Sequence, residues 1–119
     1  MTVFRSRRVA LPSGFREATV HVERGRITRI GAYDDVEAGA PVEEVECALL
    51  PGVVDTHVHV NEPGRTEWEG FETATRAACA GGITTIVDMP LNSIPPATSA
   101  RGVATKAALT EGRVHVDVG

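Results

Sequence analysis

Two histidines, His57 and His59, stand one residue apart in a run rich in β-branched residues. On a strand, side chains two positions apart share a face, with Cα atoms about 6.6–6.8 Å apart. Both imidazoles could then converge on one divalent ion, although two histidines packed or hydrogen-bonded in a sheet would have the same spacing. Asp55 lies on the same face one layer deeper, either as a residue that orients a ligand or as a polar core residue. The spacing fits a metal site and fits a pair of structural histidines equally well.

These histidines end the first predicted strand of a βαβαβ pattern. Alternating strands and helices with short connections are typical of a parallel sheet, and α/β barrels place their chemistry at the carboxyl ends of such strands. Three strands and two helices cannot cover both faces of a sheet, so we expect an N-terminal piece of a barrel protein of about 250 residues. The predicted elements are strands at 53–60, 83–89 and 114–118 and helices from 66 and at 99–111.

The first of these helices is predicted from a capping box. Thr66 followed by Glu69 signals a helix start, and Gly81 ends the periodic segment. Trp68 and Phe71 fall on one face of this helix and are expected in the core.

The first fifty residues are typical of a small β domain. Residues 15–23 alternate apolar and polar side chains, and a turn at Arg24 and Gly25 leads to a second strand at 26–30. Residues 3–4 and 9–11 are expected to add another strand, and 42–47 alternates again. We therefore divide the chain into a β domain, residues 1–50, and the first βαβαβ segment of a barrel, residues 51–119.

Composition excludes several classes of protein. Hydrophobic residues make up 42% and charged residues 24%, with a net charge of −4, as in an ordinary globular domain. No basic face is evident for nucleic acid, and no uncharged stretch is long enough to cross a membrane. Cys47 and Cys79 lack metal-type spacing, so we expect reduced thiols and a cytoplasmic location.

Three segments resemble one branch of the amidohydrolase superfamily. Residues 51–59, PGVVDTHVH, are similar to the signature that opens the barrel of the cyclic amidohydrolases. Residues 61–73 (NEPGRTEWEGFET) and 81–96 (GGITTIVDMPLNSIPP) resemble the allantoinases. Dihydroorotases typically have arginine where Asn61 stands and a shorter loop than DMPLNS, and hydantoinases usually lack EPGR. The resemblance extends over residues 3–119 and is densest from 51 to 96.

The resemblance implies a fold and an activity. The fold is α/β: the N-terminal part of a metal-dependent (α/β)8 TIM barrel, preceded by strands of a small β-sandwich domain that both chain ends build. The activity is hydrolysis of the cyclic amide of allantoin to allantoate in purine degradation, by a homotetramer. It implies two divalent ions, most simply zinc, with His57 and His59 on the more buried ion. A carboxylated bridging lysine, two further histidines and a general-base aspartate are expected beyond residue 119, so no catalytic residue is assigned here.

The remaining candidates are weighed against ordinary structural roles. Lys106, the only lysine, falls within a predicted helix and not at a strand end, so it is a poor bridging ligand. His115 and His21 are expected as surface or packing residues. Asn92 could bind the substrate or be a turn residue, and Arg65 could reach the substrate or be a solvated loop residue.

Two other functions stay open. A dihydroorotase or a hydantoinase of the dihydropyrimidinase type would share most of these motifs. A barrel relative without catalysis, acting as an assembly protein, would lack some ligands, and the intact pair His57 and His59 counts against it. The expected partner is a small-molecule substrate, with no nucleic acid and no membrane, and the 119 residues alone are expected to be inactive.

Overall fold

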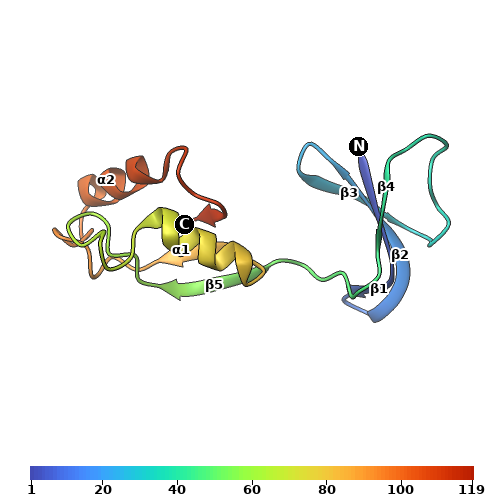
Figure 1. The fold of residues 1–119 in the computed structure, drawn as a ribbon, viewed down its shortest axis with the longest axis horizontal. Coiled ribbons are helices and arrows are strands. Elements are labelled where there is room, and N and C mark those ends of the chain that lie inside the picture. Colours follow the sequence, from blue (N-terminus) through green and yellow to red (C-terminus); the bar gives the residue numbers. More distant parts are fainter. The chain divides into compact units, whose positions relative to one another are not determined.

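The computed structural model describes all 119 residues, which divide into two compact units, Met1–Pro51 and Gly52–Gly119 (Figure 1). Unit 1 is a four-stranded sheet in the order β3-β2-β1-β4. The first three strands are antiparallel, and β4 pairs with β1 in parallel. The strands are β1 (Thr2–Leu11), β2 (Gly14–Glu23), β3 (Arg26–Gly31) and β4 (Val42–Val45).

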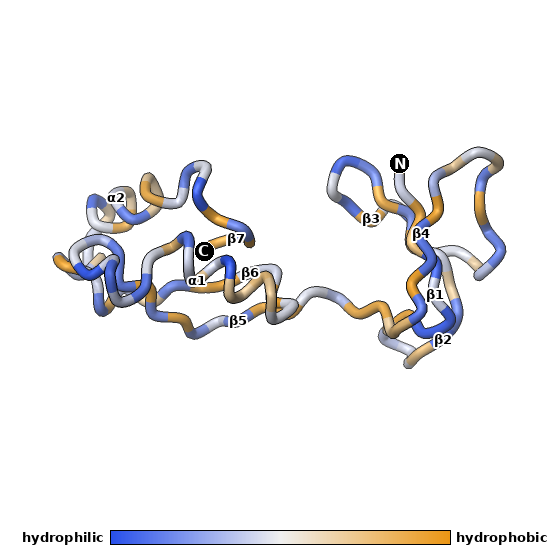
Figure 2. The backbone as a smooth tube through the Cα atoms, viewed as in Figure 1, coloured by the Kyte–Doolittle hydropathy of each residue, from blue (hydrophilic) through white to orange (hydrophobic).

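The predicted hairpin between β2 and β3 is confirmed. Arg24 and Gly25 have φ of 49° and 74°, and two successive left-handed residues make the turn whose twist matches antiparallel strands. The further strand expected from residues 3–4 and 9–11 is confirmed as β1, which runs through both with an irregularity between Ser6 and Val9. In the second half of β2, residues 18–23 alternate apolar and polar side chains, and Figure 2 shows apolar and polar stretches interspersed along unit 1.

Unit 2 has the predicted βαβαβ order. Its sheet is parallel in the order β5-β6-β7, and its core is formed by Val60, Phe71, Ala78 and Ile86. The last strand is shorter than expected: only Asp117 and Val118 pair with β6, and the valines before them pack against this core without pairing. The elements are β5 (Val53–Val58), α1 (Phe71–Ala80), β6 (Ile83–Asp88), α2 (Ala100–Thr110) and β7 (Asp117–Val118).

The predicted start of α1 is wrong. The helix begins at Phe71 with Gly70 as its N-cap, and Thr66 caps nothing. Residues 61–69 form turns instead, closed by a hydrogen bond from the Asn61 N–H to the Glu69 carbonyl at 2.9 Å. Trp68, expected in the core, belongs to these turns and is 69% exposed. Phe71 is buried as predicted.

The remaining features of unit 2 follow from its edges and caps. The valines of β5 at 53 and 54 are exposed, contrary to the buried strand predicted, because β5 is an edge strand with β6 as its neighbour. Helix α2 begins as predicted, with the Ser99 hydroxyl accepting from the Gly102 N–H at 3.2 Å. Neither helix has the length and apolar character needed to span a membrane. Both cysteines are free thiols.

Candidate metal centre

The two histidines of the HxH motif lie side by side at the carboxyl end of β5. His57 belongs to the strand, and His59 follows its last residue, Val58. Their ring centroids are 5.2 Å apart and the ring planes are inclined by 59°. The imidazoles are therefore near enough to contact one ion together.

The surroundings of the His59 ring fit a role as a metal ligand. Its Nδ1 is buried and has no hydrogen-bond partner, which is unusual for a buried polar atom. A neutral imidazole nitrogen is a common donor to divalent metals, through either ring position. No group of three or more His, Cys, Asp or Glu side chains in the chain could hold an ion. The pair can thus supply half of a four-coordinate shell.

Asp55 acts on the backbone of the motif. Its Oδ1 accepts a hydrogen bond from the His57 N–H at 3.1 Å. Of the two roles considered from the sequence, this contact favours the orienting one, through the peptide and not through the imidazole.

The other histidines and the lysine have partners of their own. His21 is buried in β2, where its Nε2 lies 3.2 Å from the Thr19 hydroxyl. His115 precedes β7, with its Nε2 3.7 Å from the Glu72 carboxylate. Lys106 is buried on α2, and its ammonium contacts the Asp88 carboxylate and not the rings of His57 and His59.

The two candidate substrate contacts lie in loops that follow β5 and β6. The Arg65 guanidinium stacks over the ring of Trp68, 4.9 Å from its centroid. Asn92 is exposed and has a φ of 69°, a left-handed conformation that asparagine adopts more readily than most residues. Left-handed residues concentrate at functional sites, but they also occur in ordinary turns. Both residues therefore stay predictions as substrate contacts.

Glu62 is a residue of the EPGR segment that sequence reasoning missed. Its buried carboxylate accepts from the Phe71 N–H at 3.0 Å and from the Arg113 guanidinium at 2.7 Å. Glu62 therefore caps α1 from outside the helix and ties the segment after β5 to the residues after α2. No local pattern signals this role, because the ion pair joins positions 51 residues apart.

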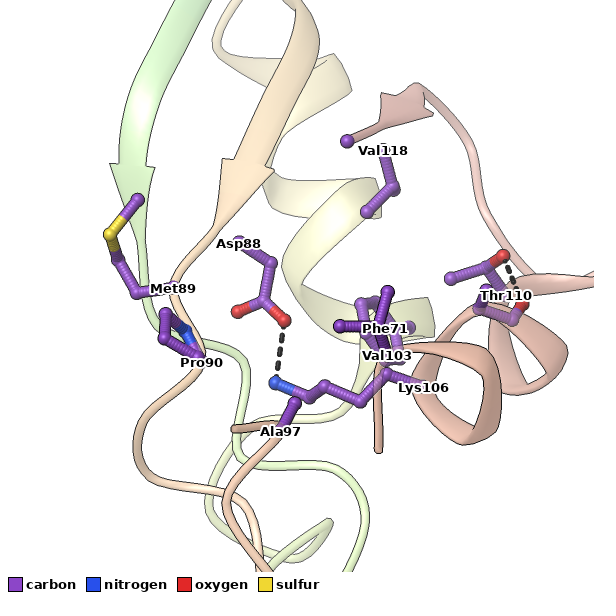
Figure 3. A pocket seen from close by; sticks show the side chains of 11 residues that line it. Phe71, Asp88, Met89, Pro90, Ala97, Val103, Lys106, Thr110 and Val118 are labelled. Atoms are coloured by element: carbon purple, nitrogen blue, oxygen red, sulfur yellow. Dashed lines mark hydrogen bonds and ion pairs between the residues drawn. The ribbon is translucent and has the colours of Figure 1, made fainter. Parts of the chain in front are cut away.

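A cavity of about 290 Å³ lies beside the carboxyl ends of β6 and β7, against α2 (Figure 3). Its wall is mostly apolar and includes Phe71, Met89 and Val118. Asp88 and Lys106 are its charged residues, and one of the dashed lines in Figure 3 joins them.

Comparison with known proteins places these residues in a family context. The amidohydrolase family matches residues 48–116. The allantoinase of Streptomyces avermitilis is 57% identical over 119 residues, which is 98% of this chain and 27% of that protein. The allantoinase of Saccharomyces cerevisiae is 50% identical over 103 residues, which is 87% of this chain and 21% of that protein. The chain spans about a quarter of the length of these relatives.

Solved structures agree on the fold. The L-hydantoinase (dihydropyrimidinase) of Arthrobacter aurescens superposes with a TM-score of 0.83 at 31% identity, covering 99% of this chain and 26% of that one. The D-hydantoinase of Bacillus sp. AR9 gives 0.81 at 30% identity, covering 100% and 26%. The predicted fold class, the N-terminal part of an (α/β)8 barrel with preceding β-domain strands, is confirmed. That both chain ends build the β domain stays a prediction.

Proposed function

The chain belongs to the amidohydrolase family, and from this membership we propose that it is the N-terminal part of an allantoinase, a hydrolase that opens the cyclic amide of allantoin to give allantoate. The observation that carries the proposal is the identity of 42–57% to allantoinases of bacteria, yeast, frog and plant, over most of the chain. The HxH motif and the EPGR segment both lie within the matched residues.

In this proposal His57 and His59 hold the more buried of two divalent ions, most simply zinc. The adjacent rings and the unpartnered Nδ1 of His59 support that role. A divalent ion in such a site polarises an amide carbonyl and lowers the pKa of a water molecule to about 7. Asp55 holds the His57 peptide in place. The bridging lysine and the remaining ligands are expected outside these 119 residues.

Substrate choice is proposed to depend on the loops after β5 and β6. Asn61 stands where dihydroorotases typically carry an arginine for a carboxylate, and allantoin has no carboxylate. Loss of a charge-assisted hydrogen bond corresponds to roughly 1.5–3 kcal/mol, or about 10- to 150-fold in binding. Allantoin should therefore be preferred to dihydroorotate by at least this factor. Asn92 and Arg65 are the residues proposed to contact the substrate.

A second candidate is hydrolysis of hydantoins or dihydropyrimidines. It is favoured by the solved structures, which are hydantoinases and superpose over nearly the whole chain. Their identities of 31% and 30% are lower than those of the allantoinases. We further propose a cytoplasmic homotetramer that acts in purine breakdown.

The test uses the full-length protein that contains this chain. Turnover is measured on allantoin, hydantoin, dihydrouracil and dihydroorotate, together with metal content by mass spectrometry. Allantoin should give the highest kcat/KM, and His57→Ala combined with His59→Ala should remove bound metal and reduce hydrolysis to background. His115→Ala, in the same unit but outside the motif, is the matched control and should keep both.

Each contrary result has a defined meaning. A higher kcat/KM on hydantoin or dihydrouracil would replace the first candidate by the second. Absence of turnover on all four substrates would favour the non-catalytic assembly protein. Normal metal content in the double variant would refute the assignment of the two histidines as ligands.

A further inference from the structure

The only lysine of the chain forms a buried ion pair at the end of the sheet of unit 2. Lys106 Nζ lies 2.5 Å from Asp88 Oδ2, and the side chains are 9% and 7% exposed. Figure 3 shows the lysine side chain running from α2 to the aspartate at the end of β6. Burying two charges is costly unless they pair closely and satisfy their remaining hydrogen bonds.

Both charged groups bind the same peptide residue. Asp88 Oδ1 accepts from the Val60 N–H at 2.9 Å, and Lys106 Nζ donates to the Val60 carbonyl at 3.1 Å. Val60 is fully buried, so water cannot replace either bond. The pair therefore takes over both backbone polar groups of one residue just beyond the end of β5.

His59 lies between this residue and the last ladder contact of β5. On its other side, the Val58 carbonyl accepts from the Met89 N–H at 2.8 Å. The regular strand ends at Val58. Beyond it, side chains from β6 and α2 make the hydrogen bonds to the backbone that a neighbouring strand would otherwise make. The peptide groups that flank His59 are thus fixed from both sides, while its ring is left with an unpartnered Nδ1.

We propose that Asp88 and Lys106 are positioning residues for the HxH motif: by binding both backbone groups of Val60, they hold the His59 ring beside His57 in the geometry that a metal ion needs. The inference rests on the proposed metal role of the two histidines and not on the identity of the substrate. Residues that orient metal ligands typically change metal affinity by 10- to 100-fold when they are replaced.

The experiment uses the full-length protein, stripped of metal and titrated with zinc against a chelator of known affinity. Lys106→Met keeps the length of the side chain and removes the donor, and it should weaken zinc binding at the motif about 10- to 100-fold. Lys106→Arg keeps charge and donors and should recover at least part of that loss. Arg113→Met is the matched control, because it breaks the other partly buried ion pair of unit 2, which does not contact Val60.

Asp88→Asn tests the same idea if Lys106→Met does not fold. It keeps an oxygen for the Val60 N–H but loses the charge that pairs with Lys106, so an intermediate loss of affinity is expected. The absorption spectrum of the cobalt-substituted protein gives a second readout, since it depends on ligand geometry. It should change in Lys106→Met and Asp88→Asn and stay unchanged in Arg113→Met.

A structural role alone predicts another pattern. If zinc affinity in the Lys106 and Asp88 variants equals that of wild type, or falls only as far as in an equally destabilised Arg113→Met, the proposal is overturned. It is overturned as well if His59→Ala leaves zinc binding unchanged. If the wild-type protein binds zinc but does not hydrolyse allantoin, the proposed substrate is wrong and the affinities still decide the role of the pair.

Discussion

Replacement of Glu62 should loosen the first turn of α1 without a comparable effect on catalysis. The carboxylate is 7% exposed and accepts the Phe71 N–H, one of the four N–H groups that the start of a helix leaves without an internal partner. It also binds Arg113, whose side chain is 42% exposed. Glu62→Ala removes both contacts, whereas Glu62→Gln keeps an oxygen that can accept from Phe71.

The magnitude follows from the exposure of the two partners. A hydrogen bond to a charged group contributes about 1.5–3 kcal/mol. The ion pair adds about 0–1 kcal/mol, because solvent reaches Arg113 and screens it. Glu62→Ala should therefore cost about 1.5–4 kcal/mol of local stability, which corresponds to amide exchange about 10- to 900-fold faster. Glu62→Gln should cost about 1 kcal/mol, or roughly fivefold.

Hydrogen exchange followed by mass spectrometry of the full-length protein measures this directly. Peptides that cover residues 71–75 should exchange faster in the order wild type, Glu62→Gln, Glu62→Ala, with no change in peptides of β2 as an internal reference. Unchanged exchange at 71–75 in Glu62→Ala would refute the capping role. A large loss of kcat without faster exchange would instead place Glu62 in contact with the substrate.

Three smaller perturbations follow from other contacts. Gly64→Ala should lower the free energy of unfolding by about 1–3 kcal/mol, because φ is +91° and a Cβ would lie 2.7 Å from a neighbouring side-chain carbon. Gly82→Ala, with φ of +80° and open space around the position, should lower it by about 1 kcal/mol. Urea unfolding measures both values. The pKa of Glu44 is lowered, first by the hydrogen bond from the Tyr33 hydroxyl and second by a hydrogen bond from a guanidinium. The ionised carboxylate should therefore stabilise the fold fully above about pH 4.3, and this stabilisation should be lost as the pH falls through the lowered pKa. Unfolding midpoints at pH 7 and pH 3 should therefore differ less in Glu44→Gln than in wild type. If the Asn92 amide binds the substrate, Asn92→Ala and Asn92→Gly should both raise KM for allantoin. If instead Asn92→Gly keeps the wild-type KM and Asn92→Ala does not, only the left-handed backbone conformation at this position matters.

The hairpin of unit 1 and the βαβαβ order of unit 2 could be predicted because their signals are local. Alternation with period two marks β2, and Gly25, which adopts a left-handed φ without strain, marks the turn after it. Ser99 and Gly112 mark the ends of α2 in the same way. The HxH pair needed only the geometry of a strand to place its rings together.

The start of α1 could not be predicted, because contacts outside the local sequence pattern decide where this helix begins. Thr66 and Glu69 match a capping box, but a local pattern competes with every other contact that the segment makes. Turn hydrogen bonds hold residues 61–69, and the carboxylate of Glu62 caps the helix at Phe71. Trp68 is exposed for that reason, although its spacing to Phe71 is helical.

The order of strands and helices, the turn types and the two candidate ligands are encoded in short stretches of sequence, because they depend on backbone preferences and on periods of two to four residues. The role of the single lysine was decided by the tertiary structure alone. Lys106 meets Asp88 and Val60 across 18 and 46 positions of the chain, and Arg113 meets Glu62 across 51. Whether a buried charge is paired, and which peptide it binds, depends on how helix α2 packs against the ends of β5 and β6, and this packing has no signature in the residues around each charge.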